Sequence, residues 1–484
     1  MKPRAKNKRH LGGSLSAQNL KRSKHEGTGA ATPHFNWKDE EDEEIDSNGS
    51  DLSGDDGDDY LVVADEDDTE TVQEKRVRLA KNMLAKVRSE ESVDSMGADT
   101  EAVTERLHKE ALHAAGKLTR PVAAILNEFL QKSNGIFEGG SFHRGHNGPV
   151  TALVFGKDED TCWTSSKDCS IIRWDLSSRK CAKKFPGRKA NKKERLQKGG
   201  ASKAVPIGHF DEILTLAASD DGRFLVSGGR DRGLRIWNAR TDEMLDIFKG
   251  HRDIVSSMCF QRRSRTLFTG SHDRCIKIWN LDEMTYVDTL FGHQSYVLSL
   301  DCLGREQPVS GSDDKSVHLW KVEADSQLIF RGHKRSVESV AMIDDQNYVS
   351  ASQDGMLALW NLNKKNPIAK VHAAHPKPKG FDESGENHFW VNAVTAFSAS
   401  DLIATGSCDG FIRFWHVNLI GKQSLTEVGR APANGFVNAL SFSPNGKYLV
   451  AGIGQEPRLG RWERDKTCKN GIFVLELPDF ELKV

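Results

Sequence analysis

The stretch Gly250–Trp279, "GHRDIVSSMCFQRRSRTLFTGSHDRCIKIW", carries the pattern that decides the fold of this 484-residue chain. It begins with a Gly-His pair and ends on a tryptophan, 28 residues after the histidine and six after Asp273. Between these markers lie short runs of alternating apolar residues, separated by Asp, Gly and Ser. Such alternation predicts several short, half-buried β-strands joined by tight turns.

The same markers recur along the chain after Asn134. A tryptophan follows the histidine of each Gly-His pair by 27 or 28 residues, at Trp174, Trp237, Trp279, Trp320 and Trp360. Two further copies without the Gly-His pair end at Trp415 and Trp462. These are the markers of WD repeats, each of which forms one four-stranded blade of a β-propeller. Seven copies predict an all-β, seven-bladed propeller over residues 135–484, and we number its blades 1 to 7 by these tryptophans.

Four of the repeats contain a Ser/His/Asp grouping that resembles a hydrolase triad. One active site does not need four copies, so the repetition favours a structural role. We expect a buried hydrogen-bonded network that ties the turn before the third strand to the loop before the first strand. The predicted tetrads are His146, Ser166, Asp168 and Trp174; His251, Ser271, Asp273 and Trp279; His293, Ser312, Asp314 and Trp320; and His333, Ser352, Asp354 and Trp360. No catalytic residue is predicted, and the chain is not expected to be an enzyme.

Three blades depart from this set. Blade 2 has Gly229 at the serine position, and blade 6 lacks the Gly-His pair. Blade 7 departs furthest, because "GQEPRLGRW" (Gly454–Trp462) keeps only the tryptophan. Drift in a closing blade is one explanation, but a concentration of Pro, Gly and two Arg at one turn favours binding. The residues of that turn predicted to bind are Gln455, Glu456, Arg458 and Arg461.

Two insertions lengthen loops between blades. In regular blades an aromatic residue follows the tryptophan by 11 positions, as Phe248 follows Trp237. The same count ends the outer strand of blade 1 at Phe185, which leaves residues 186–207 as an insertion, and it places a second insertion at about 372–388. In a propeller these loops and the turn between the second and third strands open on one face. Both insertions and "GQEPRLGRW" are therefore predicted to share a face.

The first insertion is strongly basic. Residues 179–203 contain 11 Lys/Arg and one Glu, whereas the rest of the propeller is slightly acidic. A basic loop of this kind is typical of phosphate contact, and a mobile, solvated loop is the alternative. The predicted contacts are Arg188, Lys189, Lys192, Lys193, Arg195 and Lys198.

The residues before the repeats differ in composition. Residues 1–70 predict a disordered tail, since 1–38 have a net charge of +8 and 39–70 contain 17 acidic and no basic residues. Residues 71–134 predict two amphipathic helical segments, the second of which should break near Pro121. These helices either brace the propeller or bind a partner.

Two basic clusters in the tail lie on either side of an 11-residue spacer. This spacing suits a bipartite nuclear import signal, and a tail that solvates the chain or touches nucleic acid is the alternative. The residues of the predicted signal are Lys2, Arg4, Lys6, Lys8, Arg9, Lys21, Arg22 and Lys24.

The remaining composition argues against several classes of site. The eight cysteines form no Cys-x-x-Cys pair and no Cys/His cluster at metal-ligand spacing, so neither a metal site nor a disulfide framework is expected. No apolar run is long enough to span a membrane, and no signal peptide is recognisable. We expect a soluble intracellular protein without a cofactor. The sequence leaves open whether the N-terminal segment or "GIFVLELP" (Gly471–Pro478) supplies the last outer strand.

The chain resembles the family of WD-repeat proteins that interact with the U3 small nucleolar RNA. The resemblance covers about residues 70–484. Its most specific segment is "YLVAGIGQEPRLGRW" (Tyr448–Trp462), which ordinary WD proteins lack. The other segments are "QEKRVRLAK" (Gln73–Lys81), "KDCSIIRW" (Lys167–Trp174), "YVDTLFGHQ" (Tyr286–Gln294) and, more loosely, "ESGENHFW" (Glu383–Trp390).

The resemblance implies a non-enzymatic, nucleolar subunit of the box C/D U3 ribonucleoprotein. Such a subunit binds the box B/C region of the U3 snoRNA beside a small kink-turn-binding protein, with other box C/D and small-subunit processome proteins as partners. The particle acts in early pre-ribosomal RNA cleavages that lead to the small ribosomal subunit, and no membrane or small-molecule substrate is implied. The alternative is a protein-only WD-repeat scaffold in a nuclear complex, although no adaptor segment such as an F-box is apparent.

Overall fold

A computed structural model describes residues 120–131, 135–137, 139–158, 160–187, 208–377, 388–419, 423–460, 463–478 and 480. The predicted tail, the import clusters and the first predicted helical segment lie outside the described residues. The described part of the chain contains 28 strands and one α-helix.

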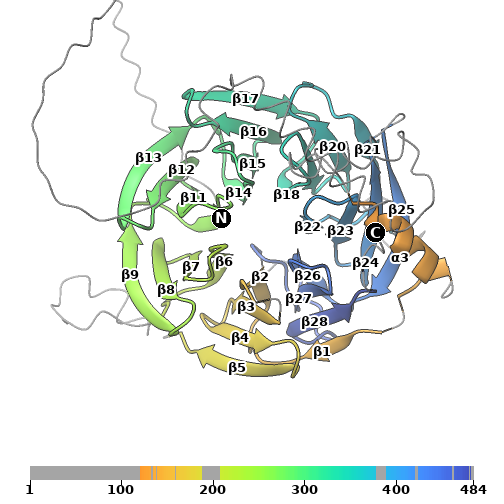
Figure 1. Ribbon diagram of the computed structural model, residues 1–484, viewed down its shortest axis with the longest axis horizontal. Helices are drawn as coiled ribbons and strands as arrows, with labels where there is room; N and C mark the ends of the chain where they lie inside the picture. The colour runs from red at the N-terminus through yellow and green to blue at the C-terminus, as the bar shows by residue number, and fades with distance from the viewer. Residues whose placement is uncertain are drawn as a thin grey trace, which may run out of the picture. The chain divides into compact units, whose positions relative to one another are not determined.

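The strands form seven four-stranded antiparallel sheets around a central channel, which confirms the predicted seven-bladed propeller (Figure 1). We name the strands of a blade a to d from the channel outward. Blade 1 comprises β2 (Val150–Phe155), β3 (Thr161–Ser166), β4 (Ile171–Asp175) and β5 (Lys180–Phe185); blade 2 comprises β6 (Ile213–Ala218), β7 (Phe224–Gly229), β8 (Gly233–Asn238) and β9 (Glu243–Lys249); blade 3 comprises β10 (Val255–Phe260), β11 (Thr266–Ser271), β12 (Cys275–Asn280) and β13 (Thr285–Phe291).

The next three blades follow the same order along the chain. Blade 4 comprises β14 (Val297–Asp301), β15 (Val309–Ser312), β16 (Ser316–Lys321) and β17 (Ser326–Arg331); blade 5 comprises β18 (Val337–Met342), β19 (Asn347–Ser352), β20 (Leu357–Asn361) and β21 (Ala369–Val371); blade 6 comprises β22 (Ala393–Ala396), β23 (Leu402–Gly406), β24 (Phe411–Asn418) and β25 (Ser424–Pro432).

The hydrophobic core lies between neighbouring blades. Strand β7 is buried along its whole length, whereas the outer strand β5 is exposed at five of its six residues. Between blades 1 and 2, for example, Trp163 and Ile171 pack in one cluster with Leu225 and Trp237. Each blade therefore needs a neighbour on both sides to bury its apolar faces, and the ring has to close.

Blade 7 closes the ring with both ends of the folded chain. Its strands are β26 (Phe436–Phe442), β27 (Tyr448–Gly454), β28 (Gly471–Glu476) and β1 (Ser141–His143). Strand β1 pairs antiparallel with β28, with Phe142 opposite Phe473. The N-terminal segment thus supplies the outer strand d, and "GIFVLELP" supplies strand c.

The predicted register of blade 7 was wrong. Trp462 was expected at the end of strand c, but strand b ends at Gly454 and strand c begins only at Gly471. Leu475 lies opposite Leu449 as Trp279 lies opposite Leu267 in blade 3, so Leu475 holds the position of the repeat tryptophan. "GQEPRLGRW" is therefore the start of a long loop and not a tight turn between two strands.

The helix α3 (Val122–Gln131) begins immediately after Pro121, where the sequence predicted a break. The carboxylate of Asp401 accepts hydrogen bonds from the backbone N–H groups of Val122 and Ala123, at 2.8 and 2.9 Å, and so satisfies donors that a helix start leaves free. Val122, Leu126 and Leu130 are buried against blade 6, so this helix braces the propeller. Within the described residues, no helix is long and apolar enough to cross a membrane.

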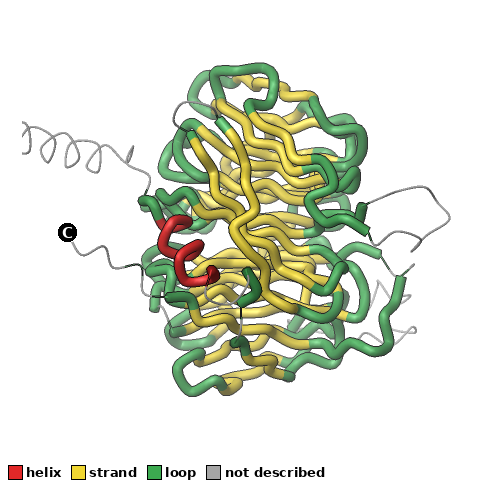
Figure 2. Tube along the Cα trace, turned by 90° about the vertical axis from the view of Figure 1, so that its right-hand side faces the viewer, coloured by secondary structure: helices red, strands yellow, loops and turns green. Residues whose placement is uncertain are grey.

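The strands run between two loop-bearing faces, as the edge-on view shows (Figure 2). We call the face of the b–c turns and of the loops between blades the upper face, and the opposite face the lower face. On the lower side, the channel widens into a cavity of ≈ 660 Å³ lined by the ends of the inner strands.

Candidate functional site

The upper face carries the ends of both insertions and the loop of blade 7. Strand β5 ends at Phe185 and β6 begins at Ile213, so the basic insertion joins blades 1 and 2 on this face. A Cβ atom on Gly208 would lie 2.6 Å from the carbonyl oxygen of Pro186, which places the two ends of the insertion side by side. Its predicted contacts lie outside the described residues, as does Arg461: Arg188, Lys189, Lys192, Lys193, Arg195 and Lys198.

Residues 455–460, which we call the clasp, are fastened to blade 1 by a buried lysine. The ammonium group of Lys167 donates hydrogen bonds to the carbonyl oxygens of Pro457, at 2.7 Å, and Gly460, at 2.8 Å. It also lies 3.8 Å from a carboxylate oxygen of Glu456. Lys167 follows strand b of blade 1 at the b–c turn, so these contacts tie the last blade to the first.

Arg458 extends from the clasp across the upper mouth of the channel. Its guanidinium donates hydrogen bonds to the carbonyl oxygens of Leu298 in β14, at 2.8 Å, and Ser256 in β10, at 3.4 Å. Burial lowers the pKa of Arg458, and the facing carboxylate of Glu338 in β18 opposes this effect. One side chain of blade 7 thus contacts blades 3 and 4 and faces blade 5.

The other clasp residues predicted to bind are also engaged within the chain. The amide nitrogen of the Gln455 side chain donates to the carbonyl oxygen of Cys468, at 2.7 Å, and its oxygen accepts from Arg464, at 3.1 Å. Asn438 donates to the backbone oxygen of Glu456, at 3.0 Å. Glu456 and Arg458 thus take part in contacts between blade 7 and other blades, whereas these bonds of the Gln455 side chain lie within blade 7.

Six blades contain the expected buried network, but a different hydroxyl joins its members. In blade 3 the indole N–H of Trp279 donates to Thr269, at 2.9 Å; Thr269 lies 2.8 Å from Nε2 of His251, and Nδ1 of that ring lies 2.9 Å from Asp273. The bridging hydroxyls, always ten residues before the tryptophan, belong to Thr164, Ser227, Thr269, Ser310, Ser350 and Thr405.

The serines predicted in this role were two residues too late. Ser166, Ser271, Ser312 and Ser352 end strand b, and each hydroxyl accepts a bond from the backbone N–H of the tetrad aspartate, at 3.1–3.3 Å. They therefore shape the b–c turn and do not bridge His to Trp. In blade 1, His146 reaches Asp168 only at 3.6 Å, and Ser170 bonds to both. In blade 5, His333 lies 3.7 Å from Asp354.

Two blades that looked incomplete in the sequence also contain the network. In blade 2, Ser227 bridges His209 and Trp237, and Gly229 leaves this bridge untouched. In blade 6, His375 bonds to Thr405, at 2.9 Å, and to Asp409, at 2.8 Å. Sequence reasoning missed His375 because the second insertion separates it from the blade; the histidine in "AAHP" was the available signal.

The tetrad aspartates are held in their charged form. Burial alone would raise the pKa of Asp273, but the hydrogen bond and charge of His251 and two backbone N–H donors lower it to about 2. In blade 2, burial also acts to raise the pKa of Asp231, but the charges and hydrogen bonds of His209 and Arg235 outweigh it and lower the pKa to about 2. At Asp314, burial again acts to raise the pKa, but hydrogen bonds outweigh it and hold the pKa well below its usual range.

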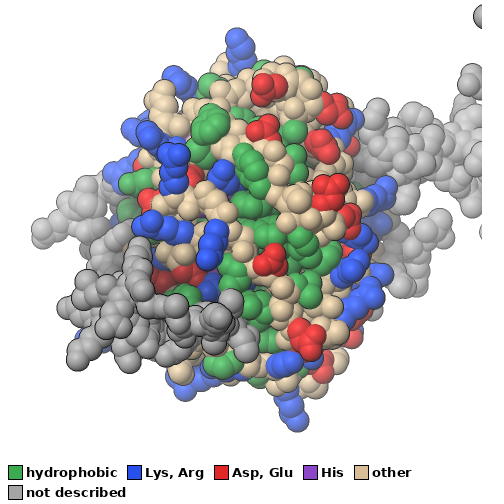
Figure 3. Space-filling model, turned by 90° about the vertical axis from the view of Figure 1, so that its left-hand side faces the viewer, with side chains coloured by type: hydrophobic (Ala, Val, Ile, Leu, Met, Phe, Trp, Pro, Cys, Tyr) green, Lys and Arg blue, Asp and Glu red, His purple; other side chains and the backbone are tan. Residues whose placement is uncertain are grey.

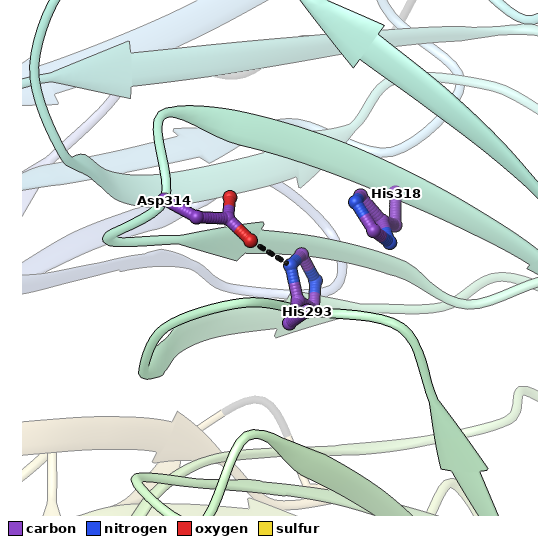
Figure 4. Close-up of side chains that lie close together, drawn as sticks. All are labelled: His293, Asp314 and His318. Atoms are coloured by element: carbon purple, nitrogen blue, oxygen red, sulfur yellow. Dashed lines mark hydrogen bonds and ion pairs between the residues drawn. The ribbon is translucent and has the colours of Figure 1, made fainter. Parts of the chain in front are cut away.

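Blade 4 places two histidines and a carboxylate together (Figure 4). The side-chain ligand atoms of His293, Asp314 and His318 lie within 4.8 Å of one another, and the two rings stack with their centroids 3.8 Å apart. Both nitrogens of His293 are already used, toward Asp314 and Ser310.

His318 comes two residues before the repeat tryptophan, where blades 2 and 6 have Arg235 and Arg413 beside the tetrad aspartate. Burial, followed by the neighbouring His293, lowers the pKa of His318 to about 4. The blade core accounts for this cluster.

Hydrophobic side chains gather on the outer rim of the propeller (Figure 3). On β13, Phe291, Val287 and Tyr286 are 71, 55 and 48% exposed. Leu328 and Ile329 extend this surface on β17, and Leu245 extends it on β9. We call these six residues the rim patch. Exposed apolar side chains that form a large patch can mark surfaces for protein contacts.

The comparisons with known proteins agree with the fold and with the repeats. The model of the WD domain, G-beta repeat, matches residues 200–238, 242–280, 284–321, 325–361, 383–416 and 424–469. The chain is 37% identical to the human U3 small nucleolar RNA-interacting protein 2 over 84% of this chain and 82% of that protein. It is 35% identical to a U3 snoRNP-associated protein-like protein of Arabidopsis thaliana over 91% of both chains.

This chain belongs to the family of U3 small nucleolar RNA-interacting WD-repeat proteins. A solved structure entitled "Structure of U3-55K" matches with a TM-score of 0.65 and 38% identity, over 70% of this chain and 98% of that chain. A second, the "Crystal structure of RRP9 WD40 repeats", matches with a TM-score of 0.64 and 38% identity. Members of such a family are interaction proteins, in which the propeller offers surfaces to partners.

Proposed function

We propose that this protein is an RNA-binding subunit of the U3 small nucleolar ribonucleoprotein that acts in early pre-ribosomal RNA processing and small-subunit biogenesis. The observation that carries the proposal is the identity of 37% over 82% of a protein named for its interaction with U3 snoRNA. A yeast relative, 26% identical over 66% of its length, is named for ribosomal RNA processing. The RNA would be the box B/C region of U3 snoRNA, bound beside a kink-turn-binding protein and other box C/D and processome proteins.

The upper face is the proposed RNA surface. Its basic insertion concentrates positive charge on a propeller whose other residues are slightly acidic, and such a loop attracts a phosphate backbone whatever the sequence. Arg188, Lys189, Lys192, Lys193, Arg195, Lys198 and Arg461 are the proposed contacts. The inward hydrogen bonds of Arg458 lead us to assign it to the shape of this face and not to a direct phosphate contact.

The salt dependence of binding tests this surface. Replacing Lys192, Lys193 and Arg195 together by Gln should weaken binding to U3 snoRNA and reduce the slope of log K against log salt by about 1 for each phosphate that the variant no longer touches. The matched control replaces three exposed lysines of the lower face by Gln: Lys157, Lys364 and Lys365. An equal weakening in both variants would show general charge attraction and would reject the upper face as the site. Crosslinking in cells followed by sequencing of the attached RNA tests the identity of the ligand.

The proposed location is the nucleus and nucleolus. If the clusters between Lys2 and Lys24 carry the import signal, deletion of residues 1–30 should move the protein to the cytoplasm. The folded propeller should be unaffected, because α3 and all the described strands lie between residues 122 and 476. Unchanged nuclear accumulation would assign import to a partner or to another segment.

A protein-only scaffold is the second candidate, and the rim patch favours it. Six exposed apolar side chains on the outer strands of three consecutive blades suit a protein partner and not a phosphate backbone. The two functions are compatible in one particle. They separate experimentally, because a pure scaffold would assemble with its partners after nuclease treatment and would show no cognate RNA in crosslinking.

A further inference from the structure

The outer strand of each blade has one edge that no other strand of its blade covers. Such an edge presents a row of main-chain N–H and C=O groups and is a template for pairing with another chain. Folded proteins therefore protect exposed edges with short strands, bulges, charged side chains or a covering segment. The seven outer strands of this ring differ in that protection.

Six outer strands are protected in one of these ways. Strands β1 and β21 have only three residues each. The register of β5, β9 and β13 shifts by one residue against strand c, as at a β-bulge, and β5 also carries three lysines. Strand β25 has such a shift and is also covered, because Phe137 N–H donates to the carbonyl oxygen of Arg430, at 2.8 Å, and Arg430 N–H donates to that of Gly135, at 2.9 Å.

Strand β17 has none of these features. All six of its residues pair with β16 in an unbroken register. Its sequence, "SQLIFR", contains no proline, and its one charged residue is Arg331 at the end. Leu328 and Ile329, in the middle, are 40 and 45% exposed. Within the part of the chain that the structure describes, β17 is therefore a long, regular and apolar edge that no segment covers.

The main chain of Gln327 and Ile329 faces this open edge. Trp320 N–H in β16 donates to the carbonyl oxygen of Pro308, at 3.0 Å, and so points toward strand b. Because the residues of an antiparallel ladder point their N–H and C=O groups alternately to either side, Gln327, which lies opposite Trp320, points these groups away from β16. Ile329, two residues further on, points them the same way.

Blade 6 shows what such an edge can bind in this protein. Arg430 lies opposite Arg413, which comes two residues before the repeat tryptophan, and Ile329 lies opposite His318 at the same position of blade 4. Ile329 is thus the equivalent of Arg430. The N–H and C=O of Arg430 both bond to the main chain of residues 135–137. The same groups of Ile329 therefore fit another segment of extended chain.

The rim around β17 favours a partner protein over a second copy of this chain. The exposed apolar side chains continue from β17 to β13 and β9, on three consecutive blades (Figure 3). The end of β13 lies directly beside β17, because a Cβ atom on Gly292 would clash with the side chain of Gln327. Two convex rims meet at one blade only, whereas an extended chain can follow the surface from one blade to the next.

This chain's own N-terminal part is a poorer occupant. Residues 1–70 are polar and strongly charged, and the apolar residues of 71–134 recur at helical spacing. A strand that pairs with β17 needs apolar residues at alternating positions instead. The sequence of that region therefore does not supply the missing strand.

We propose that the outer edge of β17 binds an extended segment of a partner protein, which pairs with the main chain of Gln327 and Ile329 as a fifth strand of blade 4. Apolar side chains of the segment pack beside Leu328 and Ile329, and an acidic side chain suits the exposed Arg331 at the end of the strand. The inference does not depend on RNA binding by the upper face. Variants of the edge should keep their affinity for U3 snoRNA, so either proposal can fail without the other.

Peptide binding to the full-length chain tests the edge. Random peptides of about 12 residues, twice the length of β17, are displayed on phage, selected on the unmodified protein and then synthesised. Ile329→Pro removes the outward N–H without removing a bond to β16, and proline is tolerated at such edge positions. It should weaken binding of the selected peptides by about 5- to 150-fold, because a carbonyl oxygen of the peptide loses its donor.

The matched control is Ile247→Pro in β9. Ile247 lies opposite Arg235, two residues before the repeat tryptophan, so it holds the position of Ile329 on a strand whose edge is protected. This variant should bind the peptides as the unmodified protein does. Should Ile329→Pro fail to fold, Ile329→Lys provides the same test with a charge that opposes pairing, and Ile247→Lys is then its control.

Methylation of single main-chain nitrogens in the peptide reports how it binds. Methyl groups at every second residue should lower the affinity by about 5- to 150-fold, because they remove the N–H groups that face β17, and those at the intervening residues should have little effect. Hydrogen exchange of the segment Ser326–Arg331 should slow when the peptide is bound. A peptide that binds as a helix or through its side chains alone would not show this period of two.

Four results would overturn the proposal. In the first, no selected peptide binds more weakly to a folded Ile329 variant than to the unmodified protein. In the second, the effects of methylation lack a period of two. In the third, edge-dependent binding appears only after deletion of residues 1–119, which would assign the edge to this chain's own N-terminal part. In the fourth, sedimentation finds a dimer of the full-length chain that Ile329→Pro dissociates, which would assign the edge to a second copy.

Discussion

Blades 1 to 6 and blade 7 solve the same packing problem with different chemistry. In blade 3, Trp279 buries an indole N–H that needs an acceptor, and Thr269, His251 and Asp273 form the chain that satisfies it. In blade 7, Leu475 occupies the tryptophan position and Ala451 lies where the bridging hydroxyl would be. The indole donor and the hydroxyl that would accept from it are thus replaced together by apolar side chains, so neither is left buried without its partner.

Closure, and not the tetrad, is therefore the special requirement of the last blade. The six regular blades fix their own b–c turns through the tetrad aspartate. Blade 7 instead borrows strand β1 from the N-terminal side and fastens its long loop to blade 1 through Lys167. Its contacts lie between residues about 160–330 positions apart, so they form only when the ring closes.

The largest expected effect is removal of the closing strand. A variant that lacks residues 1–119 should fold, whereas one that lacks residues 1–144 should lose cooperative unfolding, because β28 would have an unpaired edge. A variant that lacks residues 1–138 removes α3 and keeps β1, so it separates the two contributions. Circular dichroism during thermal unfolding measures the result. Equal stability with and without β1 would show that the clasp alone closes the ring.

The clasp should have the next largest effect. Lys167→Met leaves the carbonyl oxygens of Pro457 and Gly460 buried without donors, and should lower the free energy of unfolding by about 2–4 kcal/mol. Lys180→Met, on the exposed strand β5, is the matched control and should change it by less than about 0.5 kcal/mol. Urea titration measures both.

Arg458→Met extends the same test to the channel. It should also lower stability, since the carbonyl oxygens of Leu298 and Ser256 lose a donor and Glu338 loses its facing charge. A variant that kept full stability and lost its preference for U3 snoRNA would contradict this assignment and restore Arg458 as a recognition residue.

The sequence was sufficient for the repeats because their markers are local. Spacing between His251, Asp273 and Trp279 fixes one blade, and it holds in five copies. The bridging hydroxyl was misassigned because Thr269 and Ser271 lie two apart in one strand and project from the same side of it. Their different partners depend on strand c, which periodicity does not describe.

The closure of the ring could not be predicted from the sequence, because the contacts that form it are not local. Trp462 imitates a repeat tryptophan, while the true strand c, Gly471–Glu476, contains none. The roles of Lys167 and Arg458 depend on carbonyl oxygens far away along the chain. His375 was missed because the second insertion stretches its separation from Asp409 to 34 residues. No local spacing indicates such contacts.

A smaller effect should separate the two hydroxyls of strand β11. Thr269→Val keeps the shape of the side chain but leaves Trp279 N–H and His251 Nε2 without a partner, and should cost about 1–3 kcal/mol. Ser271→Ala removes an acceptor of one backbone N–H bond, at 3.1 Å, and should cost less. Urea titration of both variants measures the two losses in unfolding free energy. The reverse order would return the bridging role to Ser271.

The smallest effect concerns pH and a single tetrad. The pKa of Asp273 is lowered from 3.8 to about 2 in the folded state, so the unfolded chain binds its proton more readily. The resulting stabilisation is complete about one pH unit above 3.8, and it is lost as the pH falls through 3.8 toward 2. Asp273→Asn removes this contribution, so the difference in unfolding free energy between the two proteins should shrink steadily from about pH 5 to about pH 2.5. Glu283→Gln, on the exposed c–d turn of the same blade, is the matched control and should show no such convergence. A difference that stays constant over this range would mean that Asp273 stabilises blade 3 through shape and hydrogen bonding without a change in its protonation.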